Sequence, residues 1–173
     1  MAAANLPERL ENRLGWSGLG YVILAAASEA VDDRSLAQAL DGAAIGCLVV
    51  FLGALRAALR RREGEAGALS AVAVIAGSVV AAVELLDPEN VRVVLAFPTA
   101  ALVLAASIAI LTTAALPLLL GQAGVVVAAA QVPAGFAVAS SGALSPEGLV
   151  PVAAFVLFLA WIAATSIALT RAR

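Results

Sequence analysis

The chain has 173 residues, of which 63% are hydrophobic and 13% charged, with a mean hydropathy of +1.04. Soluble domains carry about 45–50% apolar residues, so lipid is the expected solvent of this chain. The absence of histidine and lysine excludes histidine-ligated metal or haem sites and lysine Schiff bases, and the single cysteine, Cys47, excludes an internal disulfide. The sequence shows no metal-ligand spacing, and we expect no cofactor.

Six apolar stretches are candidates for membrane spans, because a hydrocarbon core of about 30 Å requires about 20 apolar residues per helix. They cover residues 14–30, 43–59, 66–86, 93–116, 124–140 and 149–170. The first is short and rich in glycine, and the other five are clear. The sequence therefore predicts an all-α integral membrane bundle of six transmembrane helices, with one domain at 14–170, an N-terminal segment at 1–13 and a tail at 171–173.

Arginine positions predict the orientation, because short cytoplasmic loops collect positive charge. Eight of the ten arginines fall on the side of the termini, namely Arg9, Arg13, Arg56, Arg60, Arg61, Arg62, Arg171 and Arg173. Arg34 and Arg92 fall on the other side. We therefore expect both termini in the cytoplasm, with Arg56 and Arg60–Arg62 anchoring the second span at the inner surface. This cluster is typical of a membrane anchor, and we expect no nucleic-acid partner.

The first span also resembles a cleavable signal peptide. Arg9 and Arg13 precede an apolar run that ends in the small residues of "AAASEA" (25–30). A retained first helix is the favoured interpretation. If the apolar run did not cross the membrane, the N-terminus and both arginines would lie outside, so we count it as a span.

Carboxylates gather on the predicted outer side, and two of them lie inside the last turn of an apolar run. The set comprises Glu29, Asp32, Asp33, Asp41, Glu84, Asp87 and Glu89. Ionisable groups inside a membrane are expensive and indicate function. Glu29 and Glu84, facing one pocket, would form an acid–base pair or bind a cation. They are weak catalytic candidates, with Asp32 and Asp33 as ligand candidates, and solvation at the interface is the favoured alternative.

Polar and aromatic residues within the spans give weaker signals. Gln131, two residues before Pro133, either lines a cavity or forms an interhelical hydrogen bond, and we favour the hydrogen bond. Trp161 lies too deep for an interfacial belt and belongs to a lipid-facing or core cluster, with a ligand cavity as the alternative. Serine and threonine hydroxyls are expected to bond back to their own helices.

Small residues and prolines predict packing details. Two pairs four residues apart, Gly42 with Gly46 and Gly53 with Ala57, are candidates for tight helix crossings, although chance spacing in so alanine-rich a chain is the favoured alternative. Pro133 is expected to bend the fifth span near its middle. Pro117 is expected to end the fourth span and begin a tight turn.

Three segments resemble a family of small actinobacterial multi-pass membrane proteins known as a domain of unknown function. They are "FLGALRAALRRREGEAGALSAVAVIAG" (51–77), "LTTAALPLLLG" (111–121) and "SGALSPEGLVPVAAFVLFLAWIAATSIAL" (141–169). The main marks are the arginine-rich second loop and the spacing of Trp161 to Ser166. The loop "DPENVR" (87–92) is shorter than the family pattern, and the turn after Pro117 lacks its tryptophan and cation. The resemblance implies six spans and an actinobacterial source, and no activity.

Three function classes follow. The leading one is a membrane protein without enzymatic chemistry that binds a lipophilic or small ligand among its helices or packs against other membrane subunits. The first alternative is a small transporter or the substrate-binding membrane subunit of an uptake system, which would require a loop-capped pocket at the outer face, near Asp32–Asp41 and Glu84–Glu89. The second alternative is an intramembrane enzyme that uses Glu29 and Glu84 as acids on an isoprenoid-like substrate. The oligomeric state stays open.

Overall fold

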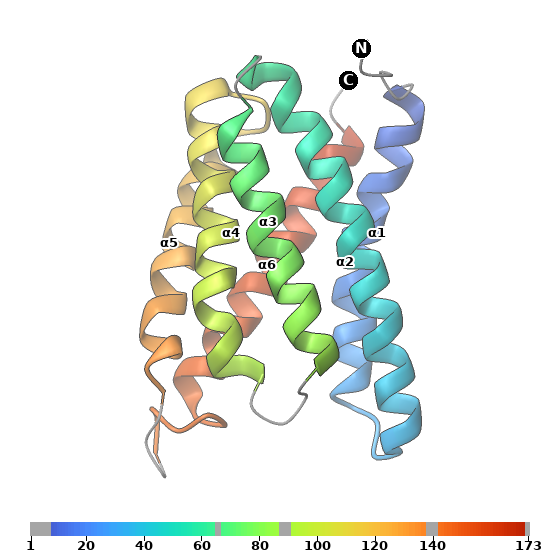
Figure 1. Cartoon of the computed structure of the whole chain (residues 1–173), viewed down its shortest axis with the longest axis vertical. Coiled ribbons are helices and arrows are strands. Elements are labelled where there is room, and N and C mark those ends of the chain that lie inside the picture. Colours follow the sequence, from blue (N-terminus) through green and yellow to red (C-terminus); the bar gives the residue numbers. More distant parts are fainter. Residues whose placement is uncertain (1–7, 65–66, 87–90, 138–141, 172–173) are drawn as a thin grey trace.

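The structure, a computed structural model, describes residues 8–64, 67–86, 91–137 and 142–171, and within these ranges it contains six α-helices and no strand (Figure 1). The side chains of residues 8–13, 86 and 91–92 are outside the description. The helices are α1 (Glu8–Ser28), α2 (Arg34–Glu63), α3 (Ala68–Leu86), α4 (Val91–Thr113), α5 (Leu118–Gly135) and α6 (Leu149–Arg171). The predicted all-α bundle is confirmed.

Five of these helices, α2 to α6, are long and apolar enough to cross a membrane. In α1 the apolar part is shorter, covering Leu14–Ser28. Large apolar side chains such as Ile75, Val126 and Val156 are exposed on the outside of the bundle. A protein in water would bury such side chains, so the exposed surface supports a lipid environment.

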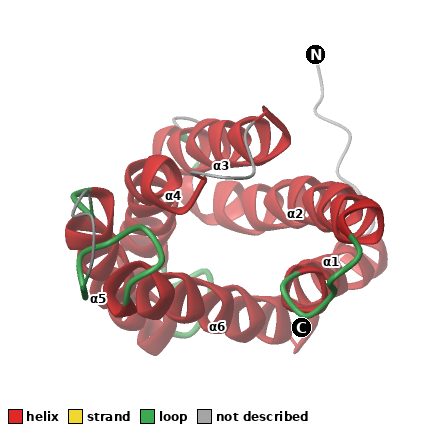
Figure 2. Ribbon diagram, turned by 90° about the horizontal axis from the view of Figure 1, so that it is seen from below, coloured by secondary structure: helices red, strands yellow, loops and turns green. Residues whose placement is uncertain are grey.

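The helices form a closed ring in which each one packs against its neighbours in the chain and α1 packs against α6 (Figure 2). Successive helices run in opposite directions, so α1 begins and α6 ends at the same end of the bundle (Figure 1). Tyr21, Phe51, Phe158 and Trp161 fill the interior. Because Tyr21 of α1 belongs to this core, the segment that resembles a signal peptide is an integral part of the bundle.

The second helix is longer than the predicted span, which covered only residues 43–59. Asp33 caps its N-terminus by accepting hydrogen bonds from the backbone N–H groups of Ser35 and Leu36 at 2.8 and 3.2 Å. At the other end, the helix continues through the arginine cluster to Glu63, whose carboxylate accepts from the backbone N–H of Ser70. Thirty residues correspond to about 45 Å of helix, which exceeds the thickness of the hydrocarbon core.

The predicted boundaries of the fifth span are wrong, because α5 begins at Leu118 and ends at Gly135. The fourth helix ends where Ala114 adopts a left-handed backbone conformation, with φ of 50°. Pro117 then caps α5 directly, so the glycines of "LPLLLGQAG" are inside the helix. Pro133 lies in the last turn of α5 and not near its middle, and residues 138–140 of the predicted span lie outside the described residues.

The glycines of the candidate small-residue pairs on α2 form no close helix crossing, in agreement with the favoured alternative of chance spacing. A Cβ atom added to Gly42, Gly46 or Gly53 would meet no atom within 4 Å. The buried face of α2 instead carries large residues such as Leu48, Phe51 and Leu55, and these glycines lie on the opposite face. The predicted pairs had the right spacing, but their helical phase turns them away from the neighbouring helices.

Close helix approaches occur at other glycines. On α1, a Cβ at Gly18 would collide with the Ser166 hydroxyl of α6. On α5, a Cβ at Gly124 would collide with the Ser107 hydroxyl of α4 and lie 2.6 Å from Trp161 Nε1 of α6. Glycine at these two positions therefore permits the contacts that close the ring.

Candidate functional site

The most unusual side chain in the core is Tyr21, the only tyrosine in the chain. It is 1% exposed, and its hydroxyl donates to Glu84 Oε1 of α3 at 3.2 Å. Its ring meets Phe158 of α6 edge-on, with the ring centroids 6.3 Å apart. Tyr21 therefore links three helices through the interior of the bundle.

A second carboxylate acts on this contact. Asp41 of α2, which is partly buried, lies close enough to Tyr21 and Glu84 to act on both electrostatically. Within the described part of the chain, no arginine pairs with Glu84 or Asp41. We call Tyr21, Asp41 and Glu84 the carboxylate site. It combines two acidic groups and one phenol from α1, α2 and α3.

From the sequence, Glu29 was considered as the partner of Glu84. In the structure, the groups that act on Glu84 are Tyr21 and Asp41. Tyr21 lies eight residues before Glu29, so Glu29 is about 12 Å further along the α1 axis, in the exposed turn after the helix. The carboxylate that acts on Glu84 is Asp41 of α2. Asp87 and Glu89 lie outside the described residues.

Asp32 and Asp33 lie in the exposed α1–α2 turn. Asp33 accepts from the Ser35 hydroxyl at 2.6 Å and from two backbone N–H groups. These hydrogen bonds to its charged form, with the Ser35 side chain contributing most, lower the pKa of Asp33. Helix capping therefore accounts for the position of Asp33.

Gln131 forms the interhelical hydrogen bond that we favoured from the sequence. Its Nε2 donates to the backbone carbonyl of Ala154 on α6 at 2.8 Å, and the side chain is 4% exposed. Such a bond satisfies a buried amide without a ligand. Gln131 therefore connects α5 to α6 as a structural residue.

Trp161 also belongs to the core, where it is 3% exposed. Its Nε1 donates to the backbone carbonyl of Leu120 on α5 at 3.1 Å. The tryptophan thereby fixes the first turn of α5 against α6. Its position inside the bundle confirms the core interpretation over the lipid-facing one.

Several hydroxyls within the helices follow the expected pattern, and three buried ones do not. Ser28, Ser78, Thr112 and Thr113 donate to carbonyls of their own helices. The exceptions, which are fully buried and have no hydrogen-bond partner among the described residues, are Ser107, Thr165 and Ser166. Ser107 and Ser166 lie against Gly124 and Gly18, so they stand at the close helix approaches.

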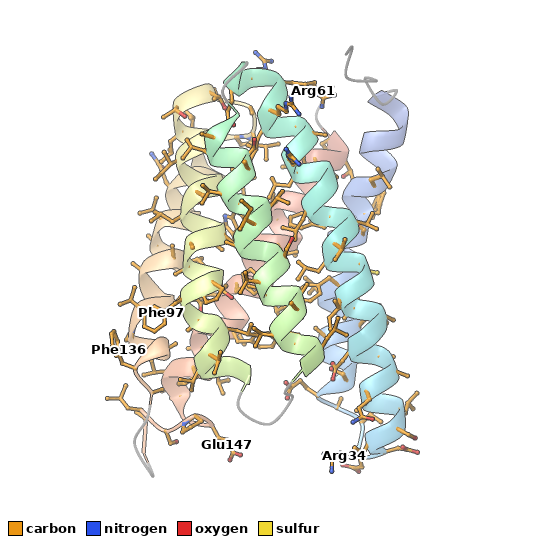
Figure 3. The ribbon with its side chains drawn as sticks, in the orientation of Figure 1. Arg34, Arg61, Phe97, Phe136 and Glu147 are labelled. Carbon is orange, nitrogen blue, oxygen red and sulfur yellow. The ribbon has the colours of Figure 1, made fainter. Side chains whose placement is uncertain are left out.

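The two ends of the bundle carry different charges. Figure 3 shows Arg61 at the end where α6 finishes, and Arg34 with Glu147 at the opposite end. Arg56, Arg60 and Arg62 are exposed near the first end, on the last turns of α2. The side chains of Arg9, Arg13 and Arg92, and Arg173, lie outside the description. The anchor arginines are therefore part of a helix and not of a loop, as the longer α2 requires.

Tyr21 is a site residue that the sequence analysis did not identify. One signal was available, because a phenol in the middle of an apolar run requires a hydrogen-bond partner. Asp41 was considered only within the outer-face region 32–41 that a transporter would use together with 84–89, and its individual proximity to Glu84 depends on how α2 and α3 pack. Among the described residues, no group of three or more metal-binding side chains is present.

The chain was compared with protein-family models, curated proteins and solved structures, and no match was found. The family resemblance therefore stays a prediction.

Proposed function

We propose that this protein binds a lipophilic organic cation at the carboxylate site, as a multi-pass protein of a bacterial cytoplasmic membrane. The observation that carries the proposal is the placement of Glu84 and Asp41 on adjacent membrane helices, with Tyr21 as the hydrogen-bond donor to Glu84. Carboxylates in an apolar wall are costly unless a positive species neutralises them. A bound cation supplies that charge, and protons compete with it.

The surroundings of the site favour an organic cation over a hard metal ion. Hard cations such as Ca²⁺ and Mg²⁺ take about six oxygen ligands, whereas Ala81 and Ile45, one turn from Glu84 and Asp41 toward the middle of their helices, are apolar and buried. An organic cation can interact favourably with both the carboxylates and the apolar residues of such a site. Its charge pairs with the carboxylates, and its apolar groups contact the helix faces.

Transport is a second function that such a site could perform. A cation and a proton compete for the same carboxylates, so release of one can be coupled to binding of the other. We therefore keep the transporter class as the second candidate function. It is favoured by the contribution of three different helices to the site, since movement of one helix would alter its access. A purely structural role requires no pair of carboxylates inside the apolar wall.

The first test is equilibrium dialysis of the purified chain in mild detergent with tetraphenylphosphonium as the probe. We expect binding at about pH 8 that weakens toward about pH 5, as carboxylates take up protons. Glu84→Gln and Asp41→Asn should each weaken binding by about tenfold or more, the size of a lost charge-assisted contact. Unchanged binding in both variants would overturn the proposal.

Two matched controls sharpen this test. Glu147→Gln removes an exposed carboxylate from the α5–α6 connection and should leave binding unchanged. Glu29→Gln separates the proposal from the alternative in which Glu29 and Glu84 act as a pair, because only that alternative predicts equal losses for both. Since Tyr21 is the only tyrosine, infrared difference spectra on adding the probe should show a tyrosine ring signal that Tyr21→Phe abolishes.

The proposal includes six spans with both termini in the cytoplasm. The arginines near the end where α1 begins support this orientation. Single cysteines in a Cys47→Ala background, placed at Gly64 and at Ser145, should react with a membrane-impermeant maleimide in opposite ways. In intact cells, the position at Ser145 should be labelled and the position at Gly64 protected.

A further inference from the structure

A groove of about 660 Å³ opens at the end of the bundle where α6 finishes, far from the carboxylate site. It lies between the α4–α5 turn and one face of the last turns of α6. The turn contributes residues 114–118, and α6 contributes Ala164, Ile167, Ala168 and Arg171. The volume is within the usual range of ligand sites.

The lining of this groove is apolar with a single charge. The α6 residues recur at intervals of three and four, so they form one stripe along the helix, and the stripe ends at Arg171. Arg171 is exposed, and no acidic side chain among the described residues pairs with it. An elongated apolar surface with one cation at its membrane-interface end complements a molecule with an anionic head and an apolar tail.

The groove is held in shape by contacts beneath it. The hydrogen bond from Trp161 to the carbonyl of Leu120 fixes the first turn of α5 against α6. Ala115 donates its backbone N–H to the Thr113 hydroxyl at 3.3 Å, which ties the turn to α4. A pre-formed surface loses little entropy when it binds a chain molecule.

We propose that this groove binds one anionic phospholipid, with its headgroup phosphate on Arg171 and an acyl chain along Ala164 and Ile167. The charge of Arg171 and the apolar stripe select this occupant over a neutral lipid. The first turn of α5, which has no side-chain cap, adds partial positive charge at the same end of the groove. This site is independent of the proposed cation binding.

Native mass spectrometry of the full chain in mild detergent tests the proposal, with phosphatidylglycerol and phosphatidylcholine added in turn. We expect a one-to-one complex with phosphatidylglycerol and much weaker binding of phosphatidylcholine. Arg171→Gln should lower phosphatidylglycerol binding by about fivefold, the effect of one arginine near an anionic lipid surface. Arg171→Lys should retain most of it.

Two further variants distinguish a site from general attraction. Arg56→Gln removes an exposed arginine that is not part of the groove, and it should leave binding unchanged. Ala164→Phe fills the groove and should lower binding of both lipids. Equal losses for Arg56→Gln and Arg171→Gln, or binding by Arg171→Gln at the level of the original chain, would overturn the proposal.

Discussion

The two halves of the ring use polar side chains in different ways. In α4–α6, Gln131 and Trp161 each donate to a backbone carbonyl of an adjacent helix, and both hydrogen bonds join uncharged groups. In α1–α3, Tyr21 donates to the carboxylate of Glu84, and Asp41 adds a second acidic group. Polar groups that hold a membrane bundle together can be neutral and fully paired. The carboxylates of the first half exceed that structural need, and so they indicate function.

The largest effect that we predict tests the packing of the second half. Gly124→Leu places a side chain where Ser107 and Trp161 already lie, so we expect a loss of about 3 kcal/mol in the free energy of unfolding. Unfolding of the purified chain in mixed micelles measures it. Gly53→Leu is the matched control, since nothing lies within 4 Å of that position, and it should change stability by less than about 0.5 kcal/mol. Similar losses in both variants would contradict the described packing.

Tyr21→Phe tests the first half. The variant keeps the ring contact with Phe158 but removes the donor to Glu84, so we expect a loss of about 1–2 kcal/mol. The double variant Tyr21→Phe, Glu84→Gln should recover part of this loss, because it leaves no unpaired carboxylate. A double-mutant cycle gives the coupling energy of the pair. A coupling energy of zero would mean that Tyr21 and Glu84 do not interact.

Trp161→Phe should have a smaller effect, which distinguishes the two halves directly. It removes the hydrogen bond to Leu120, and interhelical hydrogen bonds in membranes contribute about 0.6 kcal/mol on average. The loss should also be independent of pH, because neither partner titrates. A loss that varies with pH would place a titratable group near Trp161 and erase the contrast between the halves.

The smallest expected effect concerns the cap of α2. The pKa of Asp33 is lowered in the folded chain, so its contribution to stability is present above its ordinary pKa of about 3.9 and is lost as the pH falls through the lower, folded value. Asp33→Ala should therefore lower the thermal midpoint slightly at about pH 6, and the difference from the original chain should vanish at strongly acid pH. Asp32→Ala, in the same exposed turn, keeps the cap and is the matched control at about pH 6, where it should lower the thermal midpoint less than Asp33→Ala does.

Much of the fold could be predicted from the sequence, because apolar length identifies membrane helices without knowledge of their packing. The start of α5 could not, since Gly121 and Gly124 have the composition of a loop and only their contacts with α4 and α6 show that they are packing positions. The same limit applies to Gly42 and Gly46, whose spacing suggests a crossing but whose phase on α2 turns them outward. The spacing of residues shows which of them share one side of a helix. Which side faces the neighbouring helices depends on how the helices pack.

The candidate site was predictable only in part. Glu84 was identified because a carboxylate inside an apolar run is costly wherever it points. Tyr21 was not identified, and Asp41 was included only as part of the 32–41 region that a transporter would place near 84–89. These residues lie 63 and 43 positions from Glu84 in the sequence and approach it only through the order of the helices around the ring. Gln131 was easier, since a buried amide must find a partner on an adjacent helix.

The contact between α1 and α6 has a consequence for how the protein is made. A Cβ at Gly15 would lie 3.1 Å from Thr170 Cγ2, so the first helix fits closely against the last. During synthesis, α1 leaves the ribosome long before α6 exists, so its glycine-lined face lacks its partner until α6 has been made. The ring therefore closes only after α6 is added, and a chain truncated before Leu149 would remain an open arc of five helices.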